Sequence, residues 1–215
     1  MKIIDLTTWK RRGHLEFFQS CDDPTFNLVA DVDVTALMSV CKERGLSVFL
    51  ATVYLVTRAA NAVPELRTRL RADGQVVEHE VVHPGFTVLD SDELFKFCTA
   101  SYHDDGRRFF DEAADQVERA RRKCGLVEEE PGRDDLYYMT CIPWVAFTSL
   151  KHPMLFQGNL SIPRVAWGKI TRENSAATMP VSLQAHHGLC DGVHAGRFFA
   201  ELQDRLSRAG EELPG

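Results

Sequence analysis

Apolar and polar residues follow two different periods along this chain. Residues 26–34 alternate between apolar and mostly polar side chains, which is typical of a half-buried strand, so we expect one set of side chains to face inward: Phe26, Leu28, Ala30 and Val32. Alternation or a β-branched composition marks further segments, and Asp73-Gly74 between two of them signals a tight hairpin turn. These predicted strands are residues 66–70, 76–82, 86–89, 94–101, 136–142, 164–170 and 176–185.

A helical period of about 3.6 residues marks the other segments. A short helix is expected over residues 9–18, with Thr7 or Thr8 as its N-cap. A second is expected over residues 35–43, and Gly45 is suited to end it.

Two longer helices follow. Ser47 can cap a helix that ends before Pro64 and is apolar around much of its circumference, so this helix should lie deep in the core. Asp104 or Asp105 opens a charged helix that runs to about Lys123. Its expected buried side is Phe109, Phe110, Ala113, Val117 and Ala120.

The composition is that of an ordinary globular protein. With 215 residues, 44% hydrophobic and 26% charged, the chain can build one sizeable core, and we expect a single domain over residues 1–215. A strand-rich middle with helices in two groups predicts an α/β fold, a two-layer sandwich of a mixed β-sheet and covering helices.

Charge and cysteine content argue against several classes of protein. The net charge of −6 argues against nucleic acid as a partner, since phosphate binding needs a concentrated basic surface, and an anionic cofactor would need a local basic patch. The longest apolar-rich run, residues 48–56, is far shorter than the roughly 20 residues of a membrane span, and the N-terminus does not resemble a signal peptide. Six scattered cysteines without a C-x-x-C pair fit free thiols in a cytoplasmic protein.

Residues 180–203 carry more reactive side chains than any other short segment, and they change period midway. The first part alternates as in a strand, and the part from Ala195 onward has one apolar helical face. His187 lies between them and is a candidate general base, because histidine exchanges protons near neutral pH. A buried histidine beside a helix cap is an equally good interpretation. Asp191 would either orient His187 or cap the helix.

Two sets of residues have the spacing of metal ligands, and we reject both. Residues 79–83 read H-E-x-x-H, a zinc motif when a helix places the two histidines about 6 Å apart along its axis. Here β-branched neighbours and a following proline predict a strand, which would separate the histidines by about 13 Å. His187, Asp191 and His194 do not share one helix, because the glycines and the change of period place His187 before it. We therefore predict no metal site.

Residues 186–192 read H-H-G-L-C-D-G and look like the H-H-x-x-x-D-G signature of chloramphenicol acetyltransferases. Residues 9–18, 84–88 and 143–149 resemble segments of the same family in the same order, and residues 193–203 resemble the helix that follows the signature. The resemblance covers essentially the whole chain. It implies the fold of CoA-dependent acyltransferases, acetyl-CoA as co-substrate, chloramphenicol as acceptor, antibiotic resistance as the outcome, and a homotrimer with active sites between subunits.

The resemblance also implies roles for individual residues. His187 would remove the proton from the acceptor hydroxyl, which attacks the thioester directly, and Ser149 would stabilise the oxyanion. Asp191 would pair with Arg11 and hold the active-site corner in place. The residues expected near the acceptor are Phe18, Phe26, Phe95, Phe97, Phe156 and Ala166, and those expected to border CoA are Lys169 and Ile170.

At some positions the chain departs from the usual residues of this family. Phe18 and Ile170 stand where tyrosines are common, Ala166 where a threonine is usual, and Ala146 where a polar residue is frequent. His187 and Ser149, which would carry the acetyl transfer, are both present. Two alternatives remain: an acyltransferase of the same superfamily with a different hydroxyl or thiol acceptor, and a catalytically silent binding protein on the same scaffold.

Overall fold

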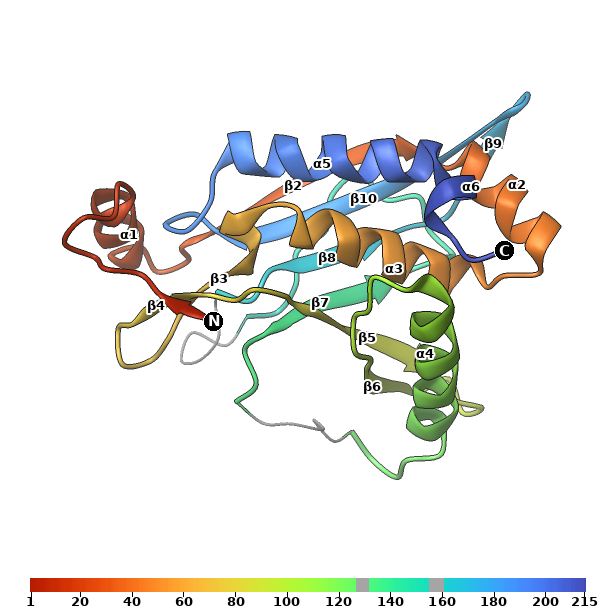
Figure 1. The fold of residues 1–215 in the computed structure, drawn as a ribbon, viewed down its shortest axis with the longest axis horizontal. Coiled ribbons are helices and arrows are strands. Elements are labelled where there is room, and N and C mark those ends of the chain that lie inside the picture. Colours follow the sequence, from red (N-terminus) through yellow and green to blue (C-terminus); the bar gives the residue numbers. More distant parts are fainter. Residues whose placement is uncertain (127–131, 155–160) are drawn as a thin grey trace.

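A seven-stranded mixed sheet forms the centre of the protein, in a computed structural model that describes residues 1–126, 132–154 and 161–215. The strand order is β2-β10-β8-β7-β5-β6, with β9 paired to β10. β7 runs parallel to β5 and β8, and the other neighbouring strands are antiparallel. This confirms the predicted α/β fold with a mixed sheet (Figure 1). The strands are β2 (Thr25–Asp33), β5 (His83–Leu89), β6 (Phe95–Thr99), β7 (Leu136–Cys141), β8 (Arg164–Trp167), β9 (Thr171–Glu173) and β10 (Ala176–His186).

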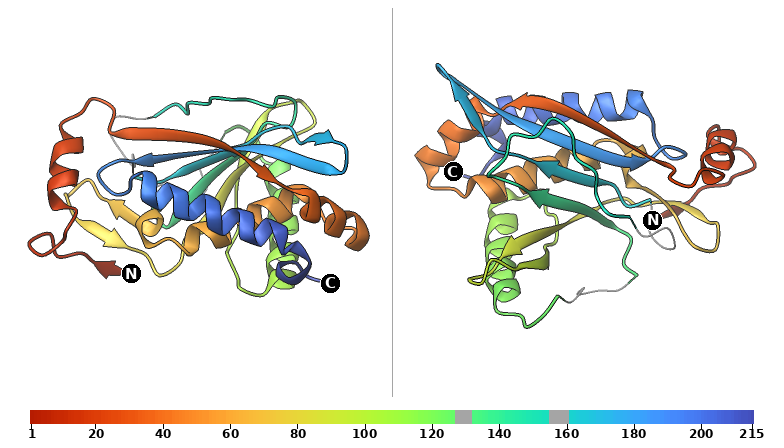
Figure 2. Two further views of the ribbon diagram at one scale, coloured as in Figure 1. Left: turned by 90° about the horizontal axis from the view of Figure 1, so that it is seen from above. Right: turned by 180° about the vertical axis from the view of Figure 1, so that it is seen from behind.

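Helices cover one face of this sheet (Figure 2). α5 lies along β2 and β10, α3 packs beside α5 and against β5 and β7, and α4 contacts β5 and β6. α2 contacts α3, α5 and the short α6. Within the described residues, no helix combines the length and the apolar character needed to span a bilayer. These helices are α2 (Thr35–Arg44), α3 (Val48–Asn61), α4 (Gly106–Arg121), α5 (Gly192–Ser207) and α6 (Ala209–Glu212).

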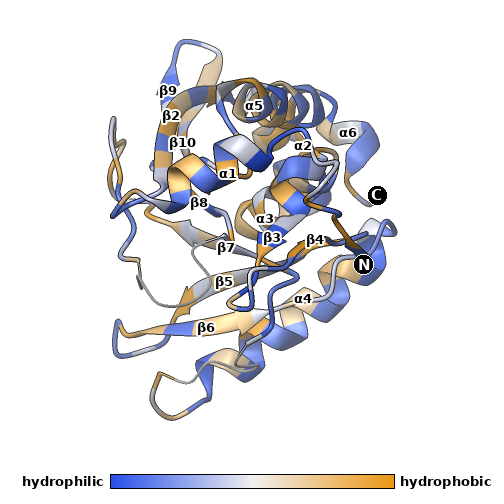
Figure 3. Ribbon diagram, turned by 90° about the vertical axis from the view of Figure 1, so that its left-hand side faces the viewer, coloured by the Kyte–Doolittle hydropathy of each residue, from blue (hydrophilic) through white to orange (hydrophobic). Residues whose placement is uncertain are grey.

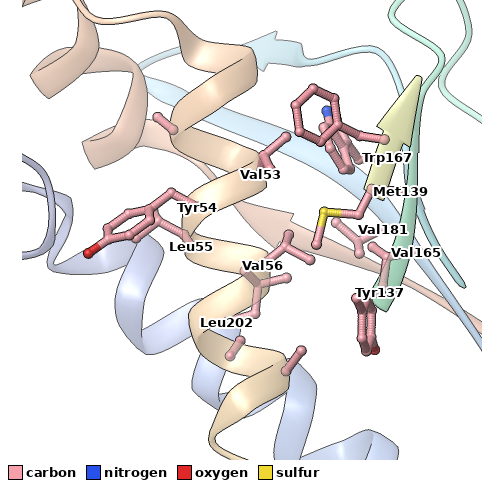
Figure 4. Close-up of a cluster of buried hydrophobic side chains, with 14 of the residues drawn as sticks. Val53, Tyr54, Leu55, Val56, Tyr137, Met139, Val165, Trp167, Val181 and Leu202 are labelled. Atoms are coloured by element: carbon pink, nitrogen blue, oxygen red, sulfur yellow. The ribbon is translucent and has the colours of Figure 1, made fainter. Parts of the chain in front are cut away.

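α3 lies at the centre of the hydrophobic core, as its apolar circumference predicts. Ser47 caps it by accepting a hydrogen bond of 3.3 Å from the backbone N–H three residues later. Gly45 ends the preceding helix α2 in a left-handed conformation with φ of 66°. Figure 4 shows the α3 side chains beside residues of β7, β8 and β10, among them Met139, Val165 and Val181.

α4 has the two-sided character that its sequence predicts. Asp105 caps it by accepting a hydrogen bond of 3.0 Å from the N–H of Arg107. Hydrophobic and hydrophilic residues follow one another along the helix (Figure 3). The predicted buried side is confirmed for Phe109, Ala113, Val117 and Ala120, and Phe110 is half-buried.

A second, three-stranded sheet joins the N-terminus to the predicted hairpin, whose turn contains Gly74 with φ of 83°. α1 follows the first strand of this sheet and lies at one end of the molecule (Figures 1 and 2). The elements of this region are β1 (Lys2–Ile3), α1 (Arg12–Gln19), η1 (Pro64–Arg67), β3 (Thr68–Leu70) and β4 (Val76–Glu78).

The start of α1 differs from the prediction. The helix begins at Arg12 rather than at residue 9, and neither threonine caps it. The hydroxyl of Thr7 donates instead to Oδ1 of Asp5 at 2.7 Å, and that of Thr8 donates to the Asp5 carbonyl at 3.3 Å. These hydrogen bonds hold the residues before α1 in a turn, so the first helical turn forms later.

The burial of β2 also differs from the prediction. Val32 is buried and Phe26 is half-buried, but Leu28 is 41% exposed and Ala30 is exposed as well. β2 is the outermost strand of its sheet, so its side chains have a neighbouring strand on one side only. The prediction that all four residues are buried was therefore wrong for two of them.

Candidate active site

His187 follows the last residue of β10, where two aromatic rings hold its imidazole. Phe18 of α1 stacks on it with ring centroids 4.1 Å apart and planes 6° from parallel, and Phe26 of β2 lies at 4.8 Å. The backbone N–H of His187 donates to the carbonyl of Pro24 at 2.8 Å. Nδ1 is buried and has no hydrogen-bond partner in the described part of the chain, whereas the residue as a whole is half-buried. Nε2 is therefore the nitrogen available for exchange of a proton with a ligand.

Arg11 and Asp191 hold the backbone beside this imidazole. Nη1 of Arg11 donates to Oδ2 of Asp191 at 2.8 Å, and Nη2 donates to the carbonyl of His187 at 3.1 Å. Burial is the largest single influence on the Asp191 carboxyl and raises its pKa, but the hydrogen bond from Arg11, the charge of His194 and the N–H of Val193 together outweigh it, so the pKa lies below its usual value. Asp191 also caps α5 by accepting from the N–H of Val193 at 3.2 Å. Asp191 thus acts on His187 through Arg11 rather than by binding the imidazole. Arg11, Phe18, Phe26, His187 and Asp191 are called the His187 corner below.

His186 differs from its neighbour in environment. It is buried, and its Nδ1 accepts a hydrogen bond of 3.1 Å from the N–H of Gly188. Burial lowers the pKa of His186 to about 4, so its imidazole is neutral near pH 7. A Cβ at position 188 would approach Cε1 of His186 and Cα of Leu15 to 3.0 Å, so only glycine lets α1 pack this closely on the turn.

A cavity of about 990 Å³ lies away from the His187 corner. It is lined by residues of α3, β5, β6, β7 and β8 and by the ends of the segment 142–153. Three predicted site residues line it, namely Phe95, Phe97 and Ile170. The cavity is not lined by His187, Phe18 or Phe26, so the predicted residues fall into two separate groups in one chain.

Ser149 belongs to the segment that runs between these two groups. Residues 142–144 and 152–153 line the cavity, while the carbonyl of Leu150 accepts a hydrogen bond from the side chain of Asn27, which follows Phe26. Ser149 itself is exposed, and its hydroxyl has no hydrogen bond within the described ranges. Ser149 thus belongs to a segment whose ends line the cavity and whose Leu150 contacts β2 beside Phe26, and among the described residues it forms no hydrogen bond to either region.

A sequence model of the family described as chloramphenicol acetyltransferase matches residues 1–203. The chain belongs to the chloramphenicol acetyltransferase family. A chloramphenicol acetyltransferase of a Klebsiella species is 32% identical over 206 residues, which are 93% of this chain and 91% of the relative. A solved structure of a chloramphenicol acetyltransferase is similar with a TM-score of 0.85 and 28% identity, over 96% of this chain and 100% of that one. The truncated catalytic core of the 2-oxoacid dehydrogenase multienzyme complex from Thermoplasma acidophilum shares the fold, with a TM-score of 0.68, 18% identity, and coverage of 96% of this chain and 98% of that one.

The remaining three predicted site residues belong neither to the His187 corner nor to the described lining of the cavity. Ala166 is fully buried on β8. Lys169 is exposed, and its backbone N–H donates to the carbonyl of Val145 at 2.9 Å. Phe156 lies outside the described residues. The roles assigned to all these residues stay predictions.

The H-E-x-x-H match does not form a helical pair. His79 follows β4 and lies 3.0 Å from a carboxylate oxygen of Asp134, whereas His83 begins β5 and lies 3.8 Å from one of Asp135. In the described part of the chain, no group of three or more histidine, cysteine, aspartate or glutamate side chains is arranged to hold a metal ion.

Sequence reasoning missed three polar residues that line the cavity, which are Tyr138, His152 and Arg164. The alternation of β7 could have placed Tyr138 on the face opposite the fully buried Tyr137. No local signal identifies His152 or Arg164, because the cavity is assembled from segments far apart in the sequence.

Proposed function

We propose that this protein transfers the acetyl group of acetyl-CoA to a hydroxyl of chloramphenicol and so confers resistance to the antibiotic. The observation that carries the proposal is the His187 corner, in a chain of the chloramphenicol acetyltransferase family. An imidazole clamped between two rings, with Nδ1 buried, has little rotational freedom and presents Nε2 to a reacting hydroxyl.

The proposed reaction is a direct transfer. Nε2 of His187 takes the proton of the acceptor hydroxyl as its oxygen attacks the thioester carbonyl. The hydroxyl of Ser149 donates a hydrogen bond to the oxygen that gains negative charge in the tetrahedral intermediate. The carbon–sulfur bond then breaks, the thiolate of CoA takes the proton back from His187, and the acetylated acceptor leaves. Arg11 and Asp191 keep the backbone of His187 in place throughout.

We further propose that the active site is shared between subunits of a homotrimer. The separation of His187 from the cavity within one chain supports this arrangement, since a second copy could bring its His187 corner to the cavity of the first. Large apolar side chains exposed near both regions also support an interface, among them Trp144 at 67% and Val145 at 54% exposure.

The first experiment measures thiol release from acetyl-CoA with chloramphenicol, for the wild type and for His187→Ala. We expect release by the wild type and a loss of about 10²–10⁴-fold in the variant. Absence of release by a folded wild-type protein that binds acetyl-CoA would favour a different acceptor.

A second experiment tests the shared site by mixing two inactive variants, His187→Ala and the cavity-filling Thr87→Trp. Random mixing in a trimer would restore about one quarter of the sites, because each intact site needs one unmodified corner and one unmodified cavity from adjacent subunits. A site contained in one chain would give no recovery above the two single variants. Thr87→Val serves as the control for the substitution itself, and sedimentation velocity checks the assembly of each mixture.

A further inference from the structure

The cavity contains an arginine that has no carboxylate partner among the residues that the structure describes. Arg164 lies at the start of β8 and is half-buried, and its guanidinium lies over the ring of Tyr138, 5.5 Å from the centroid. Its one side-chain hydrogen bond in the described residues is a long contact of 3.4 Å to the carbonyl of Ile162. Burial lowers the pKa of Arg164, which reflects the cost of keeping this charge away from water.

Each of the other half-buried arginines of the described ranges has a carboxylate or several backbone carbonyls as partners. Arg44 donates to the carbonyls of Gly210, Leu213 and Pro214. The others pair with carboxylates, and they are Arg11, Arg58, Arg67, Arg71, Arg133 and Arg205. A guanidinium without such a partner in a partly desolvated site is costly, and a ligand that brings a negative charge would offset this cost.

The cavity around Arg164 is suited to a negatively charged group. None of the described side chains that line it is an aspartate or a glutamate, although the chain as a whole has a net charge of −6. The other arginine of the lining, Arg121, is exposed and already paired with Glu118 at 2.9 Å.

His152 adds a second polar group to the same wall. Its backbone N–H donates to Oε1 of Gln184 at 3.1 Å, and Gln184 lies opposite Arg164 in the β10–β8 pair. Nε2 of the His152 ring is buried and has no hydrogen bond in the described part of the chain. Burial, with a further contribution from Arg164, lowers the pKa of His152 to about 4, so the ring is neutral near pH 7 and can donate a hydrogen bond to an anion.

The geometry points to Arg164 and His152 as the binding site for an anionic group of the acceptor, so the preferred substrates are hydroxyl compounds that carry a carboxylate on an apolar body. This inference rests on the proposed acetyl transfer. A guanidinium binds a carboxylate through two parallel charge-assisted hydrogen bonds, whereas the nitro group of neutral chloramphenicol offers two oxygens with little charge. The apolar part of the cavity, which includes Phe95 and Phe97, would hold the body of the acceptor.

The test compares chloramphenicol with its analogue in which a carboxylate replaces the nitro group on the same ring. The ratio of kcat/KM for the carboxylate analogue over that for chloramphenicol should exceed one in the wild type. It should fall about 10- to 100-fold in Arg164→Met, as expected for loss of hydrogen bonds to a charged group, and recover in part in Arg164→Lys. Arg197→Met, which replaces an exposed arginine of α5 outside the cavity, is the control and should leave the ratio as it is. An equal ratio in the wild type and Arg164→Met overturns the inference.

Two further measurements distinguish acceptor binding by Arg164 from co-substrate binding and from failure of the proposed function. The phosphates of acetyl-CoA are another source of negative charge, so the assays are repeated with S-acetylpantetheine, which lacks them. An effect of Arg164→Met that disappears with S-acetylpantetheine assigns Arg164 to the co-substrate and overturns the inference. If the wild type acetylates neither acceptor, the proposed function fails. Calorimetric binding of the carboxylate analogue then decides the inference: weaker binding to Arg164→Met supports it, and equal binding overturns it.

Discussion

The His187 corner and the cavity are built in different ways. In the corner, hydrogen bonds and ring contacts fix each group, and Arg11 holds both Asp191 and the carbonyl of His187. The cavity is formed mainly by apolar side chains from several elements and encloses about 990 Å³. In the proposed reaction, the corner would position one reacting group with little freedom, whereas the cavity would select an acceptor by shape and charge. Loss of a corner group should therefore lower mainly kcat, whereas variants of the cavity should change mainly KM.

The largest effect is expected from His187. His187→Ala and His187→Gln should each reduce kcat by about 10²–10⁴-fold, because the general base is lost. Circular dichroism and the melting temperature should stay close to the wild type. His186→Ala is the control, since its imidazole binds a backbone N–H instead of facing a ligand. An essential His186 together with a dispensable His187 would mean that the base has been assigned to the wrong residue.

Ser149 should give the next largest effect. Ser149→Ala should lower kcat by about 10²–10³-fold, since its hydrogen bond would strengthen only as charge develops on the oxyanion. Steady-state kinetics with varied chloramphenicol separate kcat from KM. Thr148, its exposed neighbour, provides the matched control as Thr148→Ala. A change confined to KM would place Ser149 in acceptor binding and remove it from the chemistry.

Arg11 and Asp191 should show measurable coupling. Their side chains keep 15% and 31% exposure, so the coupling should be about 1–3 kcal/mol, between the values for buried and for surface pairs. Arg11→Met and Asp191→Asn, singly and combined, form the cycle, and asparagine retains the ability to cap α5. Denaturant unfolding and kcat are measured for all four proteins. Additive changes in both would exclude the pair as the element that positions His187.

The smallest effect is expected from Phe18. Phe18→Tyr keeps the ring that stacks on His187 and adds a hydroxyl, which can form one hydrogen bond to the acceptor. A hydrogen bond of about 0.5–1.5 kcal/mol should lower KM for chloramphenicol by up to about tenfold and leave kcat nearly constant. Phe18→Leu, which removes the stacked ring, should instead lower kcat. An unchanged or higher KM in Phe18→Tyr would place the acceptor away from this ring.

Local signals in the sequence predicted local structure well. The caps at Ser47 and Asp105 and the glycine at position 45 were identified correctly, because each depends on hydrogen bonds or backbone angles within a few residues. Leu28 was placed wrongly, since its exposure depends on where β2 lies in the sheet and not on the alternation of the strand. Patterning thus identifies strands but does not tell an inner strand from an outer one.

The candidate site was predictable only in part. The resemblance identified Arg11 and Asp191, and the structure joins them. Phe95 and Phe97 alternate on β6 and so share one face, but their separation from His187 could not be inferred from spacing. Arg164 gave no signal because its lack of a partner is a property of the assembled cavity.

The Arg11–Asp191 contact joins residues 180 positions apart in the chain. During synthesis the ribosome delivers Arg11 and Phe18 long before the histidine that they position. A nascent chain released before Asp191 carries no assembled His187 corner, however well its earlier part has folded. Premature termination before residue 191 would therefore yield protein without the Arg11–Asp191 pair, and a circular permutant that links the two termini and opens a distant loop would place Arg11 and Asp191 close together in the sequence.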